Sequence, residues 1–358
     1  MPPAGGPAVT LRQTSGHKDT AAGEPPRNGL ALLFPGQGSQ HEGMGKRIAQ
    51  LSKAARQIFS DADDVLDTDL SRLCFEGSEE ELEDTVNTQP AMLTTSIAHL
   101  AYLRERLEAM GRRLWPSLIA GHSLGQYSAA VAAHALDFRD GLRLVQERGR
   151  IMADWAKDRP GGLAAVLGLQ DDDVEQICRE ASSEGTVAIA VHNCPGQVVI
   201  SGDTASLESA MSAVKERGGR VRRLPISVPS HTPLMRDAAR ELARFSERLS
   251  FRNPSPPLVS NISAKLLTTA EEVREELSNQ ICAAVQWARC VIAMGNEGAG
   301  PFIEVGPGQA LTNLLRRIKG DAEGLATEKA SDASLRSLAE TLPLAVPVKA
   351  AARRQNGT

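Results

Sequence analysis

Residues 118–125, which read Leu-Ile-Ala-Gly-His-Ser-Leu-Gly, constrain the fold of this chain more than any other segment. An apolar run leads directly into a Gly-x-Ser-x-Gly turn, and an alanine-rich helical pattern over 126–133 follows it. Strand, sharp turn and helix in this order are typical of a nucleophile elbow, which lifts the Ser123 hydroxyl above a sheet. The Leu124 amide then lies at a helix N-terminus, where an unpaired N–H can stabilise an oxyanion. An ordinary Gly-Ser tight turn is the alternative interpretation.

Composition restricts the classes of protein that remain. The 358 residues are 41% hydrophobic, enough for one large domain or two smaller ones with a sizeable core. A net charge of −4 argues against nucleic-acid binding, and no apolar run reaches the ~20 residues of a membrane helix. The N-terminus lacks a signal-peptide pattern, and the five cysteines include no Cys-x-x-Cys pair. We therefore expect a reduced, cytoplasmic protein with no metal site, no disulfide framework and no membrane contact.

The order of apolar and amphipathic segments predicts an α/β core with a parallel sheet. Residues 1–28 lack periodicity and are expected to be a disordered leader. A buried parallel strand is predicted at 30–34, ended by Pro35-Gly36. Helices are predicted at 43–59, 88–110 (with Pro90 in the first turn) and 137–157. Strands alternating with helices in this way favour a parallel sheet.

Residues 159–226 have a different pattern. A strand, a helix, a hairpin around Asn193-Cys194-Pro195-Gly196, a second helix and a last strand follow one another, with bounds near 163–169, 171–182, 187–191, 197–200, 205–217 and 220–226. This βαββαβ order predicts a ferredoxin-like subdomain inserted in the larger core. The core, assigned to 29–158 and 227–320, resumes with a strand at 258–261, helices at 270–281 and 285–297, and a strand at 302–305. A tail, 321–358, is expected to hold one short helix near 332–341.

A serine nucleophile needs a base within hydrogen-bond reach, and the chain has seven histidines. His231 follows a predicted strand and precedes a predicted helix, where active-site residues of open α/β sheets concentrate. His122 adjoins the serine but is expected to point away from it. We favour His231 as the base, although sequence order alone does not decide it. The others are expected to be structural or to lie in the leader: His17, His41, His99, His134 and His192.

A second glycine turn, residues 35–40, follows the first predicted strand. It lacks the Lys-Ser/Thr ending of a phosphate loop and the spacing of a dinucleotide fingerprint. The glycines on either side of Gln37 would let backbone amides approach a reacting carbonyl closely. A plain strand-to-helix loop is the alternative.

Four segments in this order resemble the malonyl-CoA:acyl-carrier-protein transacylase family. They are Gly36-Gln37-Gly38-Ser39-Gln40, Gly121-His122-Ser123-Leu124-Gly125, Pro229-Ser230-His231 and Glu304-Val305-Gly306-Pro307-Gly308. The resemblance extends from about residue 30 to about 320 and includes residues 88–91 and 193–197. It implies an α/β-hydrolase-like core with a ferredoxin-like insert, which the strand and helix order predicts independently.

The resemblance also implies residue roles. Ser123 matches the family's nucleophile, His231 its general base, and Gln280 the residue whose main-chain carbonyl orients that histidine. The amides of Gln37 and Leu124 match the oxyanion hole.

Further positions match residues that contact the substrate. Arg148 matches the arginine that binds the free carboxylate of a malonyl group, through two parallel hydrogen bonds that a lysine would not reproduce. Gln89, His122 and Met152 are expected beside it. Without the resemblance, Arg148 would be interpreted as a solvated charge on a helix.

The activity that the resemblance implies is transfer of a malonyl group from CoA to the phosphopantetheine thiol of an acyl carrier protein. Transfer passes through a serine acyl-enzyme with ping-pong kinetics and no bound cofactor. A monomer is expected, and its pathway is fatty-acid or polyketide synthesis. Carrier proteins are usually acidic, so the candidate docking charges are Arg217, Arg220, Arg222, Arg223, Arg316, Arg317 and Lys319.

Several positions depart from the family pattern: Gln126 replaces a common glutamate, His134 a small residue, Leu163 a frequent methionine, and 191–193 a more usual Asn-x-Asn. These changes bear on acyl selectivity, which one or two methylenes alter by only ~1–3 kcal/mol. Ser230 favours malonyl, with methylmalonyl or a bulkier branched unit as the alternative. A serine hydrolase editing carrier thioesters and a non-catalytic scaffold remain as rival functions.

Overall fold

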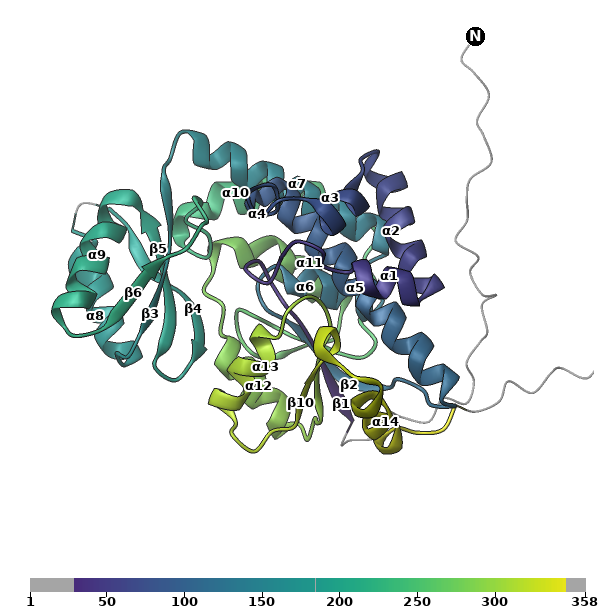
Figure 1. The fold of residues 1–358 in the computed structure, drawn as a ribbon. Helices are drawn as coiled ribbons and strands as arrows, with labels where there is room; N and C mark the ends of the chain where they lie inside the picture. The colour runs from purple at the N-terminus through teal and green to yellow at the C-terminus, as the bar shows by residue number, and fades with distance from the viewer. Residues whose placement is uncertain (1–28, 184, 346–358) are drawn as a thin grey trace, which may run out of the picture.

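The computed structural model describes residues 29–183 and 185–345, and its larger sheet has six strands (Figure 1). Their order is β10-β9-β1-β2-β7-β8, and all neighbours are parallel except β7 and β8. The strands are β1 (Leu30–Phe34), β2 (Pro116–Gly121), β7 (Leu258–Val259), β8 (Leu266–Leu267), β9 (Phe302–Glu304) and β10 (Gly324–Ala326). The predicted α/β class is confirmed, and the predicted leader lies outside the described residues.

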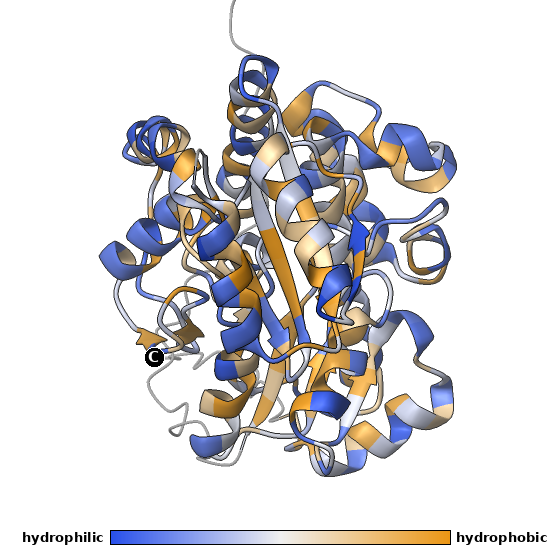
Figure 2. Ribbon diagram, turned by 90° about the vertical axis from the view of Figure 1, so that its left-hand side faces the viewer, coloured by the Kyte–Doolittle hydropathy of each residue, from blue (hydrophilic) through white to orange (hydrophobic). Residues whose placement is uncertain are grey.

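Helices cover both faces of this sheet, and β1 is therefore buried on both sides. Alternate residues of β1 enter two different apolar clusters: Leu32 packs with α5, α6 and α7, whereas Leu33 packs with α12 and α13. Figure 2 shows orange strands in the middle of the molecule, with blue concentrated on the helices and loops around them. A strand that is apolar along its whole length is expected in a parallel sheet covered on two faces.

The helices of this larger unit are α1 (Lys46–Leu51), α2 (Lys53–Leu66), α3 (Leu70–Glu76), α4 (Glu79–Glu83), α5 (Thr85–Ala109), α6 (Gly125–Ala132), α7 (Phe138–Lys157), α10 (Arg236–Ser246), α11 (Ala270–Asn279), α12 (Trp287–Asn296), α13 (Ala310–Ile318) and α14 (Asp332–Thr341), with the short 3₁₀ turns η1 (Pro233–Met235), η2 (Gln280–Cys282) and η3 (Thr327–Lys329).

Two helices differ from the sequence prediction. The helix predicted over 43–59 is two helices, because Ser52 is extended and its hydroxyl caps α2 by accepting from the Ala55 amide. The helix predicted to begin near Thr88 begins earlier, with the Asp84 carboxylate as its cap, so Pro90 lies beyond the first turn. Side-chain caps of this kind satisfy amides at the start of a helix that have no partner within it.

A second sheet has four antiparallel strands in the order β4-β5-β3-β6 and its own apolar core. It lies to one side of the larger unit, with α8 and α9 against it (Figure 1). The elements alternate along the chain as β3 (Gly161–Leu167), α8 (Asp171–Ala181), β4 (Val187–Cys194), β5 (Gln197–Asp203), α9 (Thr204–Glu216) and β6 (Arg220–Arg223). The hairpin strands are longer than the sequence indicates, because the turn is confined to Pro195-Gly196.

Within the described ranges, we find no helix with the length and apolar character needed to cross a membrane.

The elbow turn and β1 approach each other closely through glycine. A Cβ atom on Gly125 would lie 2.1 Å from the Phe34 carbonyl oxygen, and one on Gly121 would lie 2.0 Å from the Gly125 carbonyl carbon. Only hydrogen fits in these gaps. The start of α6 is therefore held against the end of β1, which fixes the height of Ser123 above the sheet.

Gly125→Ala is expected to lower the free energy of unfolding by at least about 3 kcal/mol, because the colliding atoms are backbone and cannot rotate away. Denaturant unfolding followed by circular dichroism measures this. Gly295→Ala is the matched control: its Cβ would meet nothing closer than 3.7 Å, so stability should be unchanged or higher. A Gly125→Ala protein as stable as this control would contradict the close packing.

Candidate active site

Ser123 lies in the turn between β2 and α6, with its hydroxyl oxygen 2.7 Å from Nε2 of His231. Both residues have left-handed backbone, with φ of 49° for Ser123 and 63° for His231. The His231 amide donates to the Ile281 carbonyl at 2.7 Å, which holds this backbone in place. Two residues 108 positions apart thus form a nucleophile–base contact of the length that proton transfer needs.

The imidazole of His231 is oriented by carbonyl groups instead of a carboxylate. Its Nδ1–H donates to the main-chain oxygen of Gln280 at 2.8 Å and to that of Ala283 at 3.2 Å. Because Nδ1 carries the proton, Nε2 is free to accept from the serine hydroxyl. Burial is the main cause that lowers the pKa of His231 to about 4, and the Arg148 cation adds to it. The base is therefore neutral at physiological pH.

Two backbone amides near the serine are free to bind a ligand. Neither the Leu124 nor the Gln37 N–H donates a hydrogen bond within the described residues. The Gln37 turn lies against the elbow, since a Cβ on Gly36 would be 2.3 Å from the His122 carbonyl oxygen. These are the two amides that the sequence predicts for an oxyanion hole.

The fourth sequence motif, residues 304–308, supports this turn from behind. A Cβ on Gly306 would lie 2.7 Å from Pro35 Cγ, and Gly306 has φ of 145°. The Glu304 carboxylate accepts from the Leu311 and Thr312 amides and so caps α13. Its role is structural, and burial raises its pKa.

Arg148, from α7, is 2% exposed and has no acidic partner within the described residues. Its Nη1 donates to Gln89 Oε1 at 2.8 Å, its guanidinium carbon lies 5.4 Å from the centre of the Tyr127 ring, and its Nε has no partner. An unpaired buried cation is costly unless an anion joins it. This site is therefore suited to an anionic ligand group.

Gln89 and Met152 lie beside that arginine. Gln89 Nε2 donates to the Thr85 hydroxyl at 2.9 Å and contacts the Met152 sulfur at 3.4 Å. These bonds turn the Gln89 carbonyl oxygen toward Arg148, which fixes the guanidinium in place.

His122 forms a contact between the two units and makes no hydrogen bond to the Ser123 hydroxyl. Its Nε2 lies 2.9 Å from Asn193 Oδ1 on β4, and its ring packs edge-on against Trp287 with centroids 5.3 Å apart. Burial lowers the pKa of His122. These contacts agree with the prediction that the His122 side chain points away from Ser123.

A cavity of about 410 Å³ lies between the smaller sheet and the loops and helices of the larger unit. It brings together six of the predicted site residues: Gln37, His122, Ser123, Arg148, Met152 and His231. Gln89, Leu124 and Gln280 are not among the residues that line it. The apolar part of the wall comes from both units and includes Leu163, Val191, Val199, Leu224, Ile226 and Leu314.

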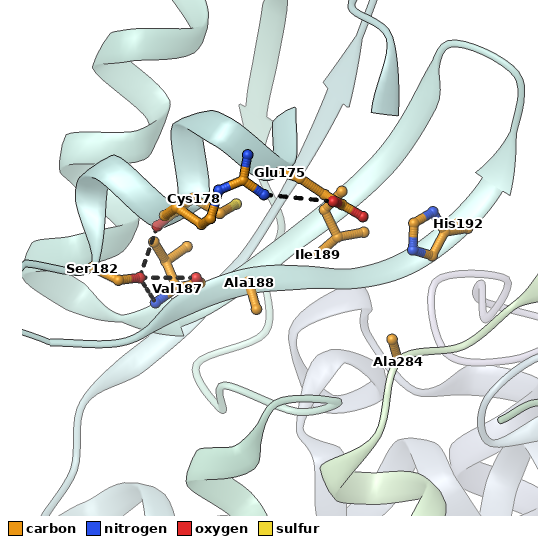
Figure 3. Close-up of a pocket in the computed structure, with 9 residues that line it drawn as sticks. Glu175, Cys178, Ser182, Val187, Ala188, Ile189, His192 and Ala284 are labelled. Carbon is orange, nitrogen blue, oxygen red and sulfur yellow. Dashed lines mark hydrogen bonds and ion pairs between the residues drawn. The ribbon is translucent and has the colours of Figure 1, made fainter. Parts of the chain in front are cut away.

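A separate cavity of about 550 Å³ lies between α8 and the edge strand β4. None of the predicted site residues lines it. Figure 3 shows Val187, Ala188 and Ile189 along this strand, with Cys178 and Glu175 of α8 facing them. His192 at its rim pairs with Asp171 at 2.8 Å, in keeping with the structural role expected of it.

One polar residue of this region was missed at the sequence level. Asn261, after β7, accepts a hydrogen bond from the Ser123 amide at 2.8 Å. Its neighbours Ser260 and Ile262 carry no pattern that indicates a site, and it lies 138 residues from the serine. The signal that could have found it is its position at the carboxyl end of a predicted core strand.

Comparisons with known proteins agree with this geometry. The acyl transferase domain family matches residues 31–335. The malonyl CoA-acyl carrier protein transacylases of Bacillus subtilis (strain 168) and Escherichia coli (strain K12) are each 40% identical, over 81% of this chain and 90% and 92% of their own. The chain belongs to the acyl transferase domain family.

Solved structures are similar over most of the chain. A complex of a malonyl-transacylase with its type II PKS acyl-carrier protein gives a TM-score of 0.81 at 38% identity, covering 87% of this chain and 99% of the other. An acyl carrier protein S-malonyltransferase from Vibrio cholerae gives 0.80 at 38% identity, covering 86% and 99%.

The pKa of His231 predicts how the reactivity of Ser123 depends on pH. Labelling by a fluorophosphonate should rise about tenfold per pH unit below pH 4 and level off above it, because only the neutral imidazole accepts the hydroxyl proton. Initial labelling rates measured by intact-protein mass spectrometry test this, with Ser123→Ala as the blank. An inflection near the ordinary histidine value of about 6.5 would contradict a buried base.

Proposed function

We propose that this chain transfers a malonyl group from CoA to the phosphopantetheine thiol of an acyl carrier protein. One observation carries the proposal: the Ser123–His231 pair and the unpaired cation of Arg148 face the same cavity. A nucleophile for the thioester and a cation for a distal carboxylate define a dicarboxylic acyl thioester as substrate. The printed names of the relatives support the same reaction.

In the first half-reaction, His231 Nε2 takes the proton of the Ser123 hydroxyl as its oxygen bonds to the thioester carbonyl carbon. The Gln37 and Leu124 amides donate to the resulting oxyanion, each worth roughly 3–4 kcal/mol of barrier. The carbon–sulfur bond then breaks, and the imidazolium returns its proton to the CoA sulfur. An ester on Ser123 and free CoA remain.

In the second half-reaction, the phosphopantetheine thiol gives its proton to His231, and its sulfur attacks the Ser123 ester. The carbon–oxygen bond breaks and the serine oxygen recovers the proton. Gln280 orients the imidazole through its main-chain oxygen in both halves. No bound cofactor takes part in these steps.

Arg148 selects the acyl group in this proposal. Its free N–H groups suit two parallel hydrogen bonds to a carboxylate, and Gln89, held by Met152 and Thr85, keeps the guanidinium plane fixed. His122, locked by Asn193, forms the wall beside the reacting carbonyl. Malonyl is the favoured acyl group because Ser230, beside His231 in the cavity wall, matches the malonyl-selective members of the family, with methylmalonyl or a bulkier branched unit as the alternative.

The architecture belongs to the same proposal. Residues 29–158 and 227–320 form an α/β-hydrolase-like core, and residues 159–226 form a ferredoxin-like subdomain. The strand–helix order β3-α8-β4-β5-α9-β6 and the sheet order β4-β5-β3-β6 support the second assignment. The sequence assigned 321–358 to a tail, but β10 pairs with β9 and Leu335 and Leu338 of α14 pack in the main apolar cluster, so the core continues through these elements. We propose a monomer that acts in the cytoplasm.

Carrier docking is assigned to arginines beside the cavity. Arg317 lines the cavity itself and bonds to the Pro195 carbonyl at 3.2 Å. Arg220, Arg222 and Arg316 have no acidic partner within the described residues, so they are free for an acidic carrier. Arg217, Arg223 and Lys319 are each paired with a carboxylate and contribute less.

Brief mixing with malonyl-CoA should add one malonyl group to the peptide that carries Ser123, and added holo carrier protein should remove it as malonyl-carrier. Intact-mass and peptide mass spectrometry measure both steps, with Ser123→Ala as control. Release of free malonate at a rate that the carrier does not change would show a hydrolase instead. If the Ser123 peptide gains no mass, the proposal is wrong. If methylmalonyl-CoA acylates more of the protein than malonyl-CoA does, the preferred acyl group is methylmalonyl.

Arg148→Ala should lower the ratio of malonyl to acetyl transfer by about 100-fold or more, because the distal carboxylate loses the buried cation that faces it. The specificity constants for the two CoA esters measure this ratio. Arg143→Ala is the matched control, since Arg143 lies on the same helix, is 52% exposed and pairs with Asp140. An unchanged ratio in Arg148→Ala would remove the assigned role of this arginine.

A further inference from the structure

A buried asparagine spans the two ends of the elbow turn. Asn261 is 0% exposed, and its side chain makes one bond to each side of His122. Its Oδ1 accepts from the Ser123 amide at 2.8 Å, and its Nδ2 donates to the Gly121 carbonyl at 2.6 Å. One amide group thus sets the distance between the last residue of β2 and the nucleophile.

The turn needs this support because the backbone of Ser123 is strained. Ser123 has φ of 49°, a region that costs a residue other than glycine about 1–3 kcal/mol. Such a conformation persists only where the surroundings determine it. The two Asn261 side-chain bonds hold the backbone of Ser123 and of Gly121 directly.

The same asparagine is connected to the base. Gln280 Nε2 donates to Asn261 Oδ1 and to the Ser123 carbonyl, both at 3.0 Å. The main-chain oxygen of Gln280 is the acceptor that orients His231. A shift of Asn261 would therefore move the serine and the imidazole acceptor together.

A buried carboxylate anchors Asn261 from below. Glu276 of α11 is 5% exposed. Its carboxylate accepts from the backbone N–H of Asn261 at 2.6 Å and from the Ser260 hydroxyl at 2.7 Å. Gln280 caps the C-terminus of this same helix. One helix therefore holds both Asn261 and the residue that orients the base.

We propose that Asn261 is a positioning residue that sets the reactive geometry of Ser123 and couples it to His231 through Gln280. This inference rests on the proposed acyl transfer. Removing the Asn261 side-chain amide should slow attack by the serine and leave substrate binding intact, because Asn261 does not line the cavity and Arg148 bonds to Gln89 instead.

Asn261→Ala should lower kcat for malonyl transfer by about 10- to 100-fold and leave the KM for malonyl-CoA within about twofold. Fluorophosphonate labelling of Ser123 should slow by a similar factor. Asn253→Ala is the matched control: Asn253 Oδ1 also accepts a backbone amide, that of Ala270, at the solvent-exposed start of α11. It should retain wild-type kcat.

Asn261→Asp supplies a readout that a purely structural role would not change. Protonated aspartate reproduces both bonds of the amide, whereas a carboxylate would place a negative oxygen opposite the Gly121 carbonyl. Burial raises the pKa of such a group, so activity should be near wild type at low pH and fall as pH rises. The titratable groups in contact with this network are Glu276 of α11, His231, Cys290 of α12 and Tyr127 of α6. The wild-type enzyme keeps all four, so the new descending limb belongs to residue 261.

Melting temperatures of each variant, measured at every pH used, separate positioning from folding. Wild-type kcat and labelling in Asn261→Ala would overturn the inference. So would an Asn261→Asp profile without a descending limb, or one whose limb follows loss of folded protein. If the fluorophosphonate labels Ser123 of the wild-type chain but the chain transfers no malonyl group, the proposed function is wrong. The labelling rates of the variants then still test the role of Asn261.

Discussion

The site depends on the contact between α6 and the end of β1, where glycine allows backbone to meet backbone. Because Gly125 lies against the Phe34 carbonyl, the elbow cannot move away from the sheet, and Ser123 keeps its height above the strand ends. The Gly36 turn reaches the same elbow from the other side. The free amides of Gln37 and Leu124 are thereby brought near one hydroxyl.

Charge and burial act together in this cavity. Arg148 and His231 are both almost fully buried, and the cation adds to the effect of burial in keeping the imidazole neutral. A carboxylate beside His231 would have raised its pKa, and the Gln280 and Ala283 carbonyls orient it without that charge. The same interior therefore holds a neutral base and a cation ready for an anionic group.

The cavity exists only because the smaller sheet lies against loops and helices of the larger unit. Leu163 and Val199 come from the smaller sheet, whereas Ser123 and His231 come from the larger unit. The His122–Asn193 bond joins the two units at the cavity wall. Small movements between the units would change the room for the acyl group without altering the nucleophile, which separates selectivity from reactivity.

The sequence by itself indicated most of the elements and the reactive types: an apolar strand, a Gly-x-Ser-x-Gly turn and a helix follow one another directly, and this order favours a sharp elbow over an ordinary tight turn. It also indicated His231, Arg148 and the amide of Gln37 through resemblance. The tertiary structure decided which groups meet. Asn261 and Glu276 lie 138 or more positions from Ser123 along the chain, and nothing in local periodicity records hydrogen bonds that join such distant segments. The helix break at Ser52 was missed for a related reason, since apolar spacing continues through a residue whose hydroxyl ends one helix and caps the next. Burial, which makes a surface-type arginine an unpaired internal cation, is a property of the assembled fold alone.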